Sequence, residues 1–588
     1  MHSSIQPHSY VVLRLPSSTL KIVQVVPNTI VSIGKFGSFP ANLLLGRPYH
    51  LTFDILEKNE SNPQTDLRIV SAAELHAEAI LDEGDSPSES RDELSADTAD
   101  GVEYDVQDDG SVTLRSNQNT IDDPNRQSLS LEDIEELKKL STGRDIIELL
   151  MKSHSGLDEK TAFSLAKYAV RKRGKYLKRF TVLPLDVSLL LEWVLTEKEA
   201  PRIMELREEL LGLVLCWSNV HHMMPLSNAY CPDDVSASGR WLVIDETSGL
   251  IVAALAEKIG VLYEEEEDEE DEERELPDSS RSYPQLNGMP VKVHQSDAIS
   301  TEEKCSDTQS NGVPSDSAAN RSSTLQPQMP VNRPPKHSVR AQSATSNSIT
   351  LLHAATQPNI SLLKYFGYDD SNANEKHHLF MHLKTLSWLQ LLSPEADSTY
   401  QEPEVVPDNI LQTWRGGKKS SYFRKRRRWE RVKDVIDDTR RGDFDGLVIA
   451  SVMEPAEILR HLLPLLKGGA PVVVFSPNVE PLVKLTDLFS KARRTAFMTN
   501  PPDDSDMPTE DFPIDPTLML NTMLQTSRAR SWQVLPGRTH PLMMARGGAE
   551  GYIFTGTRVL KGEGAARARG RFSKKRKIER GEEIEDDS

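Results

Sequence analysis

The sequence predicts a mixed α+β and α/β chain, in which a β-barrel-like N-terminal domain precedes an open α/β sheet domain. Residues 10–57 alternate between apolar and polar side chains in short runs, as the strands of a small barrel or sandwich do. Trp241–Ile244 is a short apolar run, and a polar turn and an amphipathic helix pattern from Leu250 follow it. This strand–turn–helix order is typical of the first unit of a nucleotide-binding α/β sheet.

The net charge of −20 comes from two segments of the 588-residue chain. Residues 82–126 hold 14 acidic and 3 basic residues, and residues 264–275 hold 11 acidic and 1 basic residue. Acidic runs of this kind are typical of solvated, disordered insertions. The rest of the chain is close to neutral, so the acidic balance does not exclude a nucleic-acid partner.

Length and composition bound the class of protein. The chain is long enough for about two to four domains, and 36 prolines with 37% apolar residues indicate long linkers. Cys216, Cys231 and Cys305 lack metal-ligand spacing, so we expect no zinc site, no disulfide framework and a reducing compartment. No apolar run reaches the roughly 18 residues of a membrane span, and no secretory signal pattern is present. We therefore expect neither a metal nor a membrane partner.

Composition shifts and periodicity give the expected domain boundaries. They are 1–81 for the N-terminal β-barrel domain, 82–119 for a disordered acidic insertion, 120–185 for a helical basic connector, 186–263 for the first part of the α/β domain, 264–346 for a disordered acidic and Ser/Pro-rich linker, 347–562 for the rest of the α/β domain, and 563–588 for a disordered basic and acidic tail.

Each expected element has its own local pattern. Ser130 with Asp133 forms a capping-box pattern that opens a helix through Leu140. The expected strands are Tyr10–Leu15, Leu20–Val26, Ile30–Ile33, Tyr49–Leu56, Thr181–Leu185, Ser348–Ala354, Gly446–Ala450, Pro471–Phe475 and, as a closing edge strand, Gly551–Leu560. The other expected helices are Gly143–Lys152, Asp158–Phe180, Leu189–Trp193, Ile203–Gly212, Leu362–Tyr365, His378–Leu392 and Pro455–Leu466.

The turn after Trp241–Ile244 is poor in glycine. A dinucleotide or S-adenosylmethionine loop has an acidic residue and three glycines, because the cofactor lies against bare backbone. The same spacing here gives Asp245, Thr247, Gly249 and Ile251, with only one of the three glycines. We interpret the unit as a degenerate Rossmann-like methyltransferase domain that binds no cofactor. The alternative is an ordinary α/β sheet protein of another kind.

The residues after the Gly446–Ala450 strand give no catalytic set. An enzyme that methylates a base amine usually has an acidic or Asn residue with prolines here, and this chain has Ser451-Val452-Met453-Glu454-Pro455. Pro455 suits the first position of the following helix, and Glu454 suits its N-terminus, where the charge is favourable. We therefore predict no catalytic residues.

Two stretches are strongly basic. No acidic residue lies between Thr161 and Pro184, and Thr413–Lys433 has ten basic residues against Glu430. Such stripes favour nucleic acid, although a solvated helix face, or a flexible insertion for the second stretch, is the alternative. The candidate nucleic-acid-binding residues are Lys167, Arg171, Lys172, Arg173, Lys175, Tyr176, Lys178, Arg179, Arg415 and Lys418. Lys574–Lys577 has the form of a nuclear-localisation cluster.

Several stretches together resemble one family, the non-catalytic subunits of the eukaryotic tRNA adenine-58 N1-methyltransferases. They are Val31–Ile55, Asp122–Lys139, Lys175–Leu183, the turn IDETSGLI, His353–Phe366, Gly468–Leu482 and Gly547–Leu560. They occur in family order over most of the chain that is expected to be ordered. The two acidic insertions and the long 264–346 segment depart from the family pattern.

The resemblance implies a division of labour. A related catalytic subunit would bind S-adenosylmethionine and methylate N1 of an adenine in the tRNA T-loop, in a heterotetramer with two copies of each subunit. This chain would supply tRNA-binding surface. From the cluster Lys574–Lys577 we expect a nuclear location, and we expect no metal and no cofactor bound by this chain. Because the target adenine lies inside the folded tRNA elbow, both subunits would help to distort the RNA and present the base.

Two other functions remain open from the sequence. One is an active S-adenosylmethionine-dependent methyltransferase with an unusual cofactor loop, which would bind the cofactor without a partner. The other is a structural scaffold with no RNA role, whose basic residues could be replaced without effect on tRNA affinity.

Overall fold

The computed structural model describes the chain at residues 4–56, 66–76, 102–106, 112–116, 127–140, 143–155, 162–197, 199–221, 239–263, 347–369, 377–502, 507–535, 538–542 and 551–560. The predicted linker 264–346, the predicted tail 563–588 and the cluster Lys574–Lys577 lie outside these residues. None of the described helices is long and apolar enough to cross a membrane.

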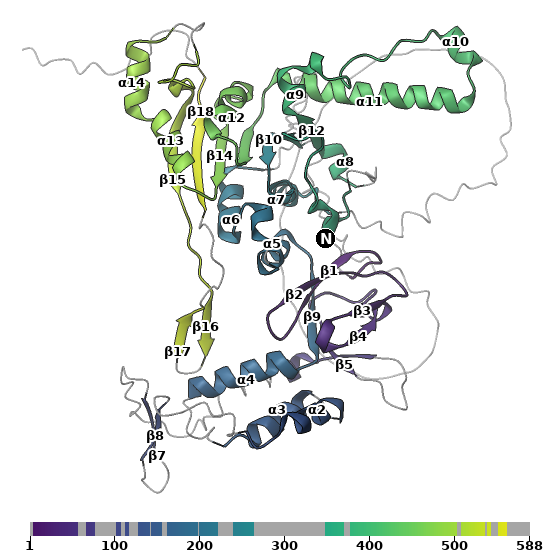
Figure 1. Ribbon diagram of the computed structural model, residues 1–588. Coiled ribbons are helices and arrows are strands. Elements are labelled where there is room, and N and C mark those ends of the chain that lie inside the picture. Colours follow the sequence, from purple (N-terminus) through teal and green to yellow (C-terminus); the bar gives the residue numbers. More distant parts are fainter. Residues whose placement is uncertain are drawn as a thin grey trace, which may run out of the picture. The chain divides into compact units, whose positions relative to one another are not determined.

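The N-terminal strands form a five-stranded antiparallel sheet with the order β2-β1-β9-β5-β6 (Figure 1). Their bounds are β1 Tyr10–Arg14, β2 Leu20–Gln24, β5 Thr52–Leu56, β6 Asp66–Ile69 and β9 Arg179–Pro184. A separate hairpin joins β3 Ile30–Ser32 to β4 Ser38–Pro40. Within the described residues β2 and β6 are the two edges of an open sheet, so the predicted β-barrel is not confirmed.

Strand β9 corrects the predicted domain boundary at residue 81. It pairs with β1 on one side and with β5 on the other, so the central strand comes from the segment predicted as a helical connector. Phe180 in β9 stacks between Phe39 and Phe53, with ring centroids 4.9 and 5.5 Å apart. The basic helix before β9 is therefore attached directly to the core of this sheet.

The connector holds α2 Leu131–Leu140, α3 Gly143–Lys152 and α4 Ala162–Tyr176. The predicted capping box at the start of α2 is confirmed. The backbone N of Ser130 donates to Asp133 Oδ2 at 3.0 Å, and the backbone N of Asp133 donates to Ser130 Oγ at 3.1 Å. Helices α3 and α4 pack through a small apolar cluster that includes Ile146, Leu150 and Tyr176.

A short hairpin corrects the prediction of disorder throughout residues 82–119. Strands β7 Val102–Val106 and β8 Val112–Ser116 pair antiparallel, with Val102 opposite Ser116. Both strands alternate apolar and polar residues, and this period allows a two-stranded ribbon inside an acidic segment. The net charge of the segment indicates disorder, whereas its local period indicates these two strands.

The second sheet has seven strands in the order β12-β11-β10-β13-β14-β18-β15. Their bounds are β10 Arg240–Asp245, β11 Ser348–His353, β12 Leu383–Ser387, β13 Gly446–Ala450, β14 Pro471–Ser476, β15 Met519–Gln525 and β18 Tyr552–Arg558. The first five strands in this order, from β12 through β11, β10 and β13 to β14, are parallel to one another. Strand β18 is antiparallel to both β14 and β15. The strand order reverses between β10 and β13, as in doubly wound sheets, so the predicted Rossmann-like sheet is confirmed.

Helices cover both faces of this sheet (Figure 1). Adjacent strand residues point to opposite faces of the sheet, so Val243 and Leu242 belong to different apolar clusters. On the face of Val243 lie α5 Val187–Thr196, α6 Glu208–Trp217 and α7 Leu250–Ile259. The face of Leu242 is covered by α12 Pro455–Leu462, α13 Glu480–Leu488 and the C-terminal part of α11 Gly416–Arg441. The sheet is thus buried on both faces, as its continuous apolar strands predict.

Two predictions about this sheet are wrong. Residues 378–392 are not one helix but α8 Leu379–His382, strand β12 and α9 Trp388–Leu392, where a Ser387–Gln390 capping box opens α9. The free edge of β11 needs a hydrogen-bonding partner, and this tertiary demand overrides a local helical pattern. Strand β18 is also not an edge strand, because β15 pairs with its outer side.

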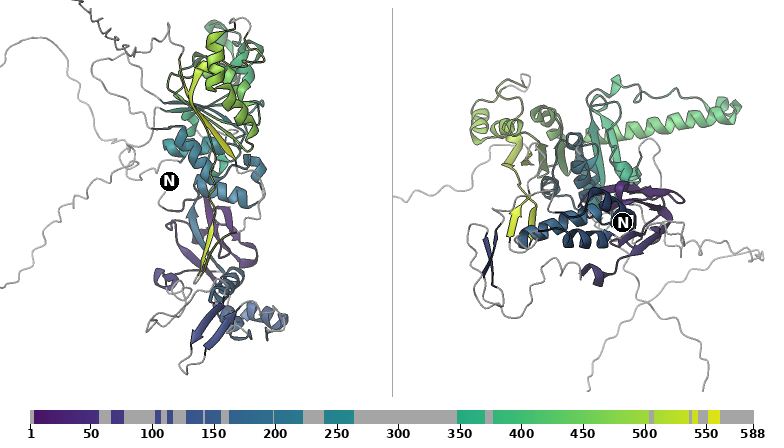
Figure 2. Two further views of the ribbon diagram at one scale, coloured as in Figure 1. Left: turned by 90° about the vertical axis from the view of Figure 1, so that its left-hand side faces the viewer. Right: turned by 60° about the horizontal axis from the view of Figure 1, so that its bottom comes forward.

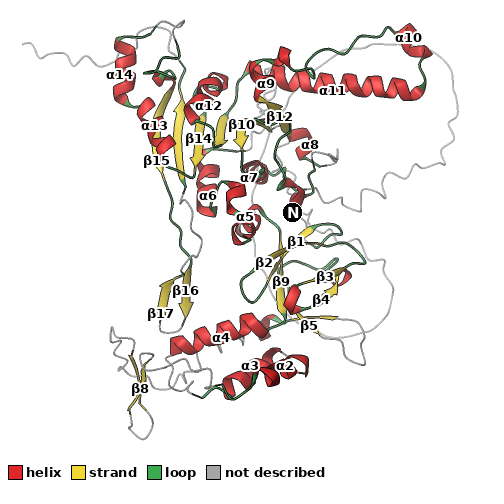
Figure 3. Ribbon diagram, in the orientation of Figure 1, coloured by secondary structure: helices red, strands yellow, loops and turns green. Residues whose placement is uncertain are grey.

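The remaining elements are not part of the two large sheets. They are α10 Asp408–Thr413, α14 Lys491–Thr499 and the hairpin of β16 Trp532–Leu535 with β17 Arg538–Pro541 (Figure 3). The basic stretch Thr413–Lys433, for which a flexible insertion was an alternative, lies mostly within α11, a single continuous helix (Figure 2).

Arg179 is a buried charge in the N-terminal sheet, with 6% of its surface exposed. Its Nε lies 2.6 Å from Asp54 Oδ1, and Arg68 Nη2 lies 2.5 Å from Asp54 Oδ2. Burial by itself would raise the pKa of Asp54, but the hydrogen bonds and charges of Arg179 and Arg68 outweigh it. The pKa of Asp54 therefore lies below its ordinary value of 3.8.

We expect Arg179→Gln to lower the free energy of unfolding by about 3 kcal/mol, because it leaves Asp54 charged and partly buried without its main partner. Since the folded pKa of Asp54 is lowered, its contribution is present above the unfolded pKa and is lost as the pH falls through the folded pKa. Urea unfolding at pH 7 and at acidic pH measures both effects. Exposed Arg171→Gln is the matched control, and equal stability of the two variants would contradict the structural role of Arg179.

Candidate nucleic-acid interface

The turn between β10 and α7 is held from inside by the buried carboxylate of Asp245. Its Oδ1 accepts from the backbone N of Thr247 at 2.7 Å and from the Thr247 hydroxyl at 2.5 Å, and its Oδ2 accepts from Val252 N at 3.0 Å. Burial raises the pKa of Asp245, and these hydrogen bonds act against that rise because they favour the charged form. The first N–H groups of α7 therefore face an internal carboxylate.

Thr247 and Ile251 fill the positions where a cofactor loop has glycines. Both residues are fully buried. The backbone N of Ile251 donates to Thr247 Oγ1 at 3.3 Å, and Ile251 belongs to the apolar cluster beneath the sheet. The two β-carbons that the sequence placed against a cofactor are thus part of the protein core.

The outer side of the turn is closed by residues 359–362, which follow β11 in the chain. Gly249 has a φ of +89°, and a β-carbon there would lie 2.9 Å from the Cα of Ile360. Leu362 N donates to the carbonyl of Ser248 at 3.1 Å. The one glycine left in the turn therefore serves the close packing of two segments of this chain.

The ends of β10 and β13 are joined where doubly wound sheets bind their ligands. Glu246 N donates to the carbonyl of Ala450 at 2.9 Å, and Glu246 Oε2 accepts from Val452 N at 2.8 Å. As predicted, Glu454 is the N-cap of α12 and Pro455 follows at its start. These residues complete local structure at the point where an amino-methylating enzyme holds its target.

These residues do not fit S-adenosylmethionine or a dinucleotide. Such cofactors need exposed backbone N–H groups and bare glycines at the start of the helix. The N–H groups of Thr247, Ile251 and Val252 already donate within the chain. Sequence analysis missed the segment 359–362, because only the fold brings it onto the turn.

Helix α4 carries the first predicted basic surface. Arg171 and Lys175 are exposed, and Lys172 is half-buried. Lys172 Nζ lies 4.8 Å from the ring centroid of Tyr168, and Lys175 Nζ lies 5.1 Å from that of Tyr176. Aromatic rings thus hold the ammonium groups of both lysines. The other predicted cations of this stretch, all half-buried and in contact within the chain, are Lys167, Arg173 and Lys178.

Two predicted residues of this stretch do not lie on a binding surface. Tyr176 is 7% exposed and packs in the cluster between α3 and α4, so its ring faces the protein core. Arg179 is the buried partner of Asp54. The sequence showed their chemical type, but not that the chain turns inward as β9 begins.

The second predicted basic site begins α11. Arg415 is the N-cap of this helix and Lys418 lies in its first turn, and both are exposed. Lys418 Nζ lies 3.8 Å from the ring centroid of Trp414. The predicted site residues therefore lie on two helices and do not form one cluster.

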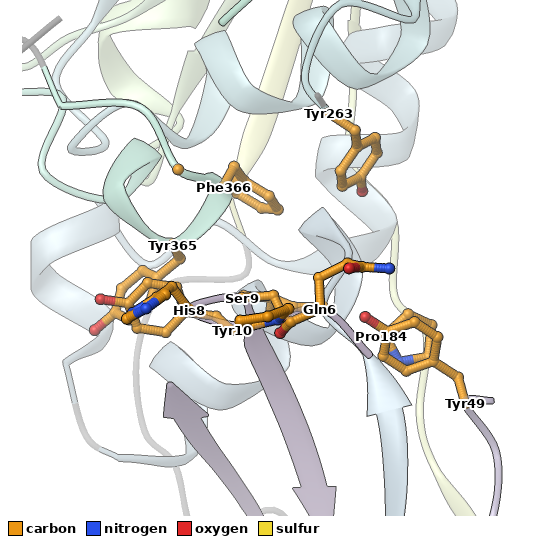
Figure 4. Close-up of a pocket in the computed structure, with 12 residues that line it drawn as sticks. Gln6, His8, Ser9, Tyr10, Tyr49, Pro184, Tyr263, Tyr365 and Phe366 are labelled. Atoms are coloured by element: carbon orange, nitrogen blue, oxygen red, sulfur yellow. The ribbon is translucent and has the colours of Figure 1, made fainter. Parts of the chain in front are cut away.

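None of these residues lines a cavity of about 270 Å³ (Figure 4). It is lined largely by aromatic side chains, including Tyr10, Tyr49, Tyr263 and Tyr365. Burial raises the pKa of Tyr49, Tyr263 and Tyr365. No lysine or arginine lines the cavity, so it lacks the charges that bind phosphate. Among the described residues, no group of His, Cys, Asp and Glu could hold a metal ion.

Comparison with known proteins identifies the family of the chain. The family model described as Gcd10p matches residues 4–415. The chain belongs to the Gcd10p family. A relative from Aspergillus fumigatus, the tRNA (adenine(58)-N(1))-methyltransferase non-catalytic subunit trm6, is 46% identical over 98% of this chain and 96% of its own. The protein of the same name from Schizosaccharomyces pombe is 26% identical over 98% of this chain and 96% of its own.

A solved structure, the tRNA (m1A58) methyltransferase TrmI from Aquifex aeolicus, is similar with a TM-score of 0.34 and 9% identity. The alignment covers 95% of this chain and 100% of that chain. The likeness is too weak to carry an argument about function. The Gcd10p model itself spans α4 and the closed turn and ends at Arg415, where α11 begins.

We expect Gly249→Ala to lower the free energy of unfolding by about 2 kcal/mol or more. The added β-carbon is strained at this φ and meets the main chain of Ile360, which has little room to move. Thermal and urea unfolding measure the change. Gly417→Ala is the control, because a β-carbon there meets open space within α11. Equal effects of the two substitutions would contradict the close packing of residues 359–362 on the turn.

Proposed function

We propose that this chain is the non-catalytic subunit of a complex that methylates N1 of adenine 58 in tRNA. The observation that carries this proposal is the closed turn Asp245–Ile251 in a Rossmann-like sheet, where the N–H groups that a cofactor needs are bound internally. The Gcd10p family membership and the names of its relatives agree with it. A catalytic subunit is the partner that such a chain requires.

We assign S-adenosylmethionine to that catalytic partner. The cofactor supplies the methyl group, and the residues of this chain take no part in its transfer. Their role is to bind and position tRNA. Because adenine 58 is reached only when the base leaves its stacked position, the complex benefits from a second subunit that holds the RNA backbone.

The tRNA-binding surface on this chain includes the exposed side of α4. Arg171, Lys172 and Lys175 lie within little more than one helical turn, so their charges can reach neighbouring phosphates. The helix is fixed by α3 and by β9, which continues into the N-terminal sheet. Rigid cations of this kind lose little conformational freedom on binding, which favours RNA affinity.

Assembly and location complete the proposal. We propose two copies of each subunit in the complex, which mass measurement of the purified assembly tests. We propose a nuclear location from Lys574–Lys577, which imaging of a chain without these residues tests.

We expect the combined Arg171→Gln, Lys172→Gln and Lys175→Gln variant to weaken tRNA binding by the complex roughly tenfold or more at 0.1 M salt. Each lost phosphate contact should also reduce the slope of log K against log salt by roughly 0.7–0.9. Filter binding over a salt series measures both quantities. Exposed Lys484→Gln on α13 is the control. A scaffold without an RNA role would leave affinity and slope unchanged.

We expect the full chain without its partner to bind no S-adenosylmethionine in calorimetry up to millimolar cofactor, because the N–H groups of Thr247, Ile251 and Val252 already donate within the chain. The complex with the catalytic subunit should bind it. Micromolar binding by this chain alone would contradict the proposed role and favour an active methyltransferase with an unusual loop.

A further inference from the structure

Helix α11 presents a row of exposed arginines, most of which form no ion pair within the described residues. Arg424, Arg427, Arg428 and Arg431 are spaced i, i+3, i+4 and i+7, so they lie on one face of the helix. All four are exposed. No ion pair is present for Arg424, Arg427 or Arg428 within the described residues. We call these four residues the arginine face.

The opposite side of α11 is bound to the preceding segment of the chain. Trp429 Nε1 donates to the carbonyl of Tyr400 at 2.9 Å, and the Tyr422 hydroxyl accepts from Val406 N at 3.2 Å. Arg426, which points to this side, lies 3.7 Å from Glu402 and 3.3 Å from Glu430. The acidic and aromatic partners thus bind one side of α11, and on the other side Arg424, Arg427 and Arg428 form no ion pair within the described residues.

The C-terminal end of α11 is anchored in the α/β domain. Ile436 and Thr439 are buried, and Asp438 receives Arg240 Nη2 at 2.9 Å and Lys384 Nζ at 3.1 Å. Arg431 lies over the ring of Phe380, with its Cζ 5.0 Å from the centroid. Because the helix is fixed at its end and along one side, the arginine face is held in position before any ligand binds.

The chemistry of this face fits the phosphate backbone of an RNA duplex. Arg424 and Arg431 lie about 10 Å apart along the axis, a length over which a nucleic-acid duplex presents roughly six phosphates. Guanidinium groups bind phosphate through paired hydrogen bonds, and here the cations are all arginine. The aromatic rings of Trp429 and Tyr422 are held within the chain, so neither of these two rings serves as a stacking platform for unpaired bases.

We propose that the arginine face of α11 binds the phosphate backbone of a duplex region of the tRNA, as a second RNA contact separate from α4. This inference rests on the proposed function, because it names the part of the RNA that the chain holds. The contact carries affinity and orientation but no base specificity. An acidic segment of this chain, such as residues 264–275, is the competing occupant that the test must separate.

The test uses the full chain in complex with its catalytic subunit. The variant carries Arg424→Gln, Arg427→Gln and Arg428→Gln, and the probes are an unmodified tRNA transcript and an unrelated RNA duplex. We expect affinity for both probes to fall roughly tenfold to a hundredfold at 0.1 M salt, with a salt slope smaller by about 2–3. The corresponding triple Arg→Lys variant should keep the wild-type slope of log K against log salt. Its affinity should lie between those of the wild type and the Arg→Gln variant.

Matched controls separate this surface from general charge. Lys484→Gln, Lys491→Gln and Arg440→Gln remove three exposed cations outside the arginine face, the last of them from the final turn of α11, and should leave binding unchanged. Urea unfolding should show equal stability of both triple variants. Wild-type affinity in the Arg→Gln variant would overturn the inference, and so would a loss for tRNA alone with none for the duplex. Deletion of residues 264–275 could raise the RNA affinity of the wild-type chain but not that of the Arg→Gln variant. This result would assign the arginine face to the acidic segment.

The proposed function and this inference fail in different ways. If the wild-type complex neither binds nor methylates tRNA, the proposed function fails. If the wild-type complex binds tRNA, the α4 variant binds weakly and the α11 variant binds normally, only the inference about the arginine face fails.

Discussion

The buried carboxylate of Asp245 is the interaction on which the closed turn depends. It lies where the positive end of the α7 dipole and the first free N–H groups meet, so a negative charge is favourable there. In a cofactor-binding sheet those N–H groups stay free for the ligand. Here Asp245 binds them from within, and the turn then accommodates Thr247 and Ile251 in the core. Residues 359–362 pack over this turn, so the place where a related sheet binds its cofactor is part of the protein interior here.

Burial, and not position in the sequence, decides which basic residues of one stretch reach the solvent. The stretch from Lys167 to Arg179 has one sign throughout, yet Arg171 and Lys175 reach solvent while Arg179 lies against Asp54 inside the N-terminal sheet. The same inward turn places Tyr176 between α3 and α4. The buried members of the stretch fix the helix to a core, and the exposed members are thereby held at the surface.

Much of the fold could be predicted because the signals are local. Capping of α2 by Ser130 and Asp133 involves residues three positions apart, and the buried strand β13 shows as a continuous apolar run. Strand β12 could not be predicted, because Leu383–Ser387 becomes a strand only when it lies beside β11. The barrel was overpredicted for a related reason, since alternation identifies strands but does not say whether the last one closes on the first.

The sequence by itself determined the strand–turn–helix unit, the loss of two glycines from its turn, the sign of the basic stretches and the family resemblance. Only the tertiary structure decided which residues work at the surface. Asp54 and Arg179 are 125 positions apart, and the turn at Gly249 is closed by Ile360 from another crossover. The exposed arginine face of α11 likewise depends on the segment from Tyr400 to Val406, which binds the other side of the helix. Periodicity and capping act between near neighbours, whereas burial and ion pairing depend on which distant segments the fold brings together.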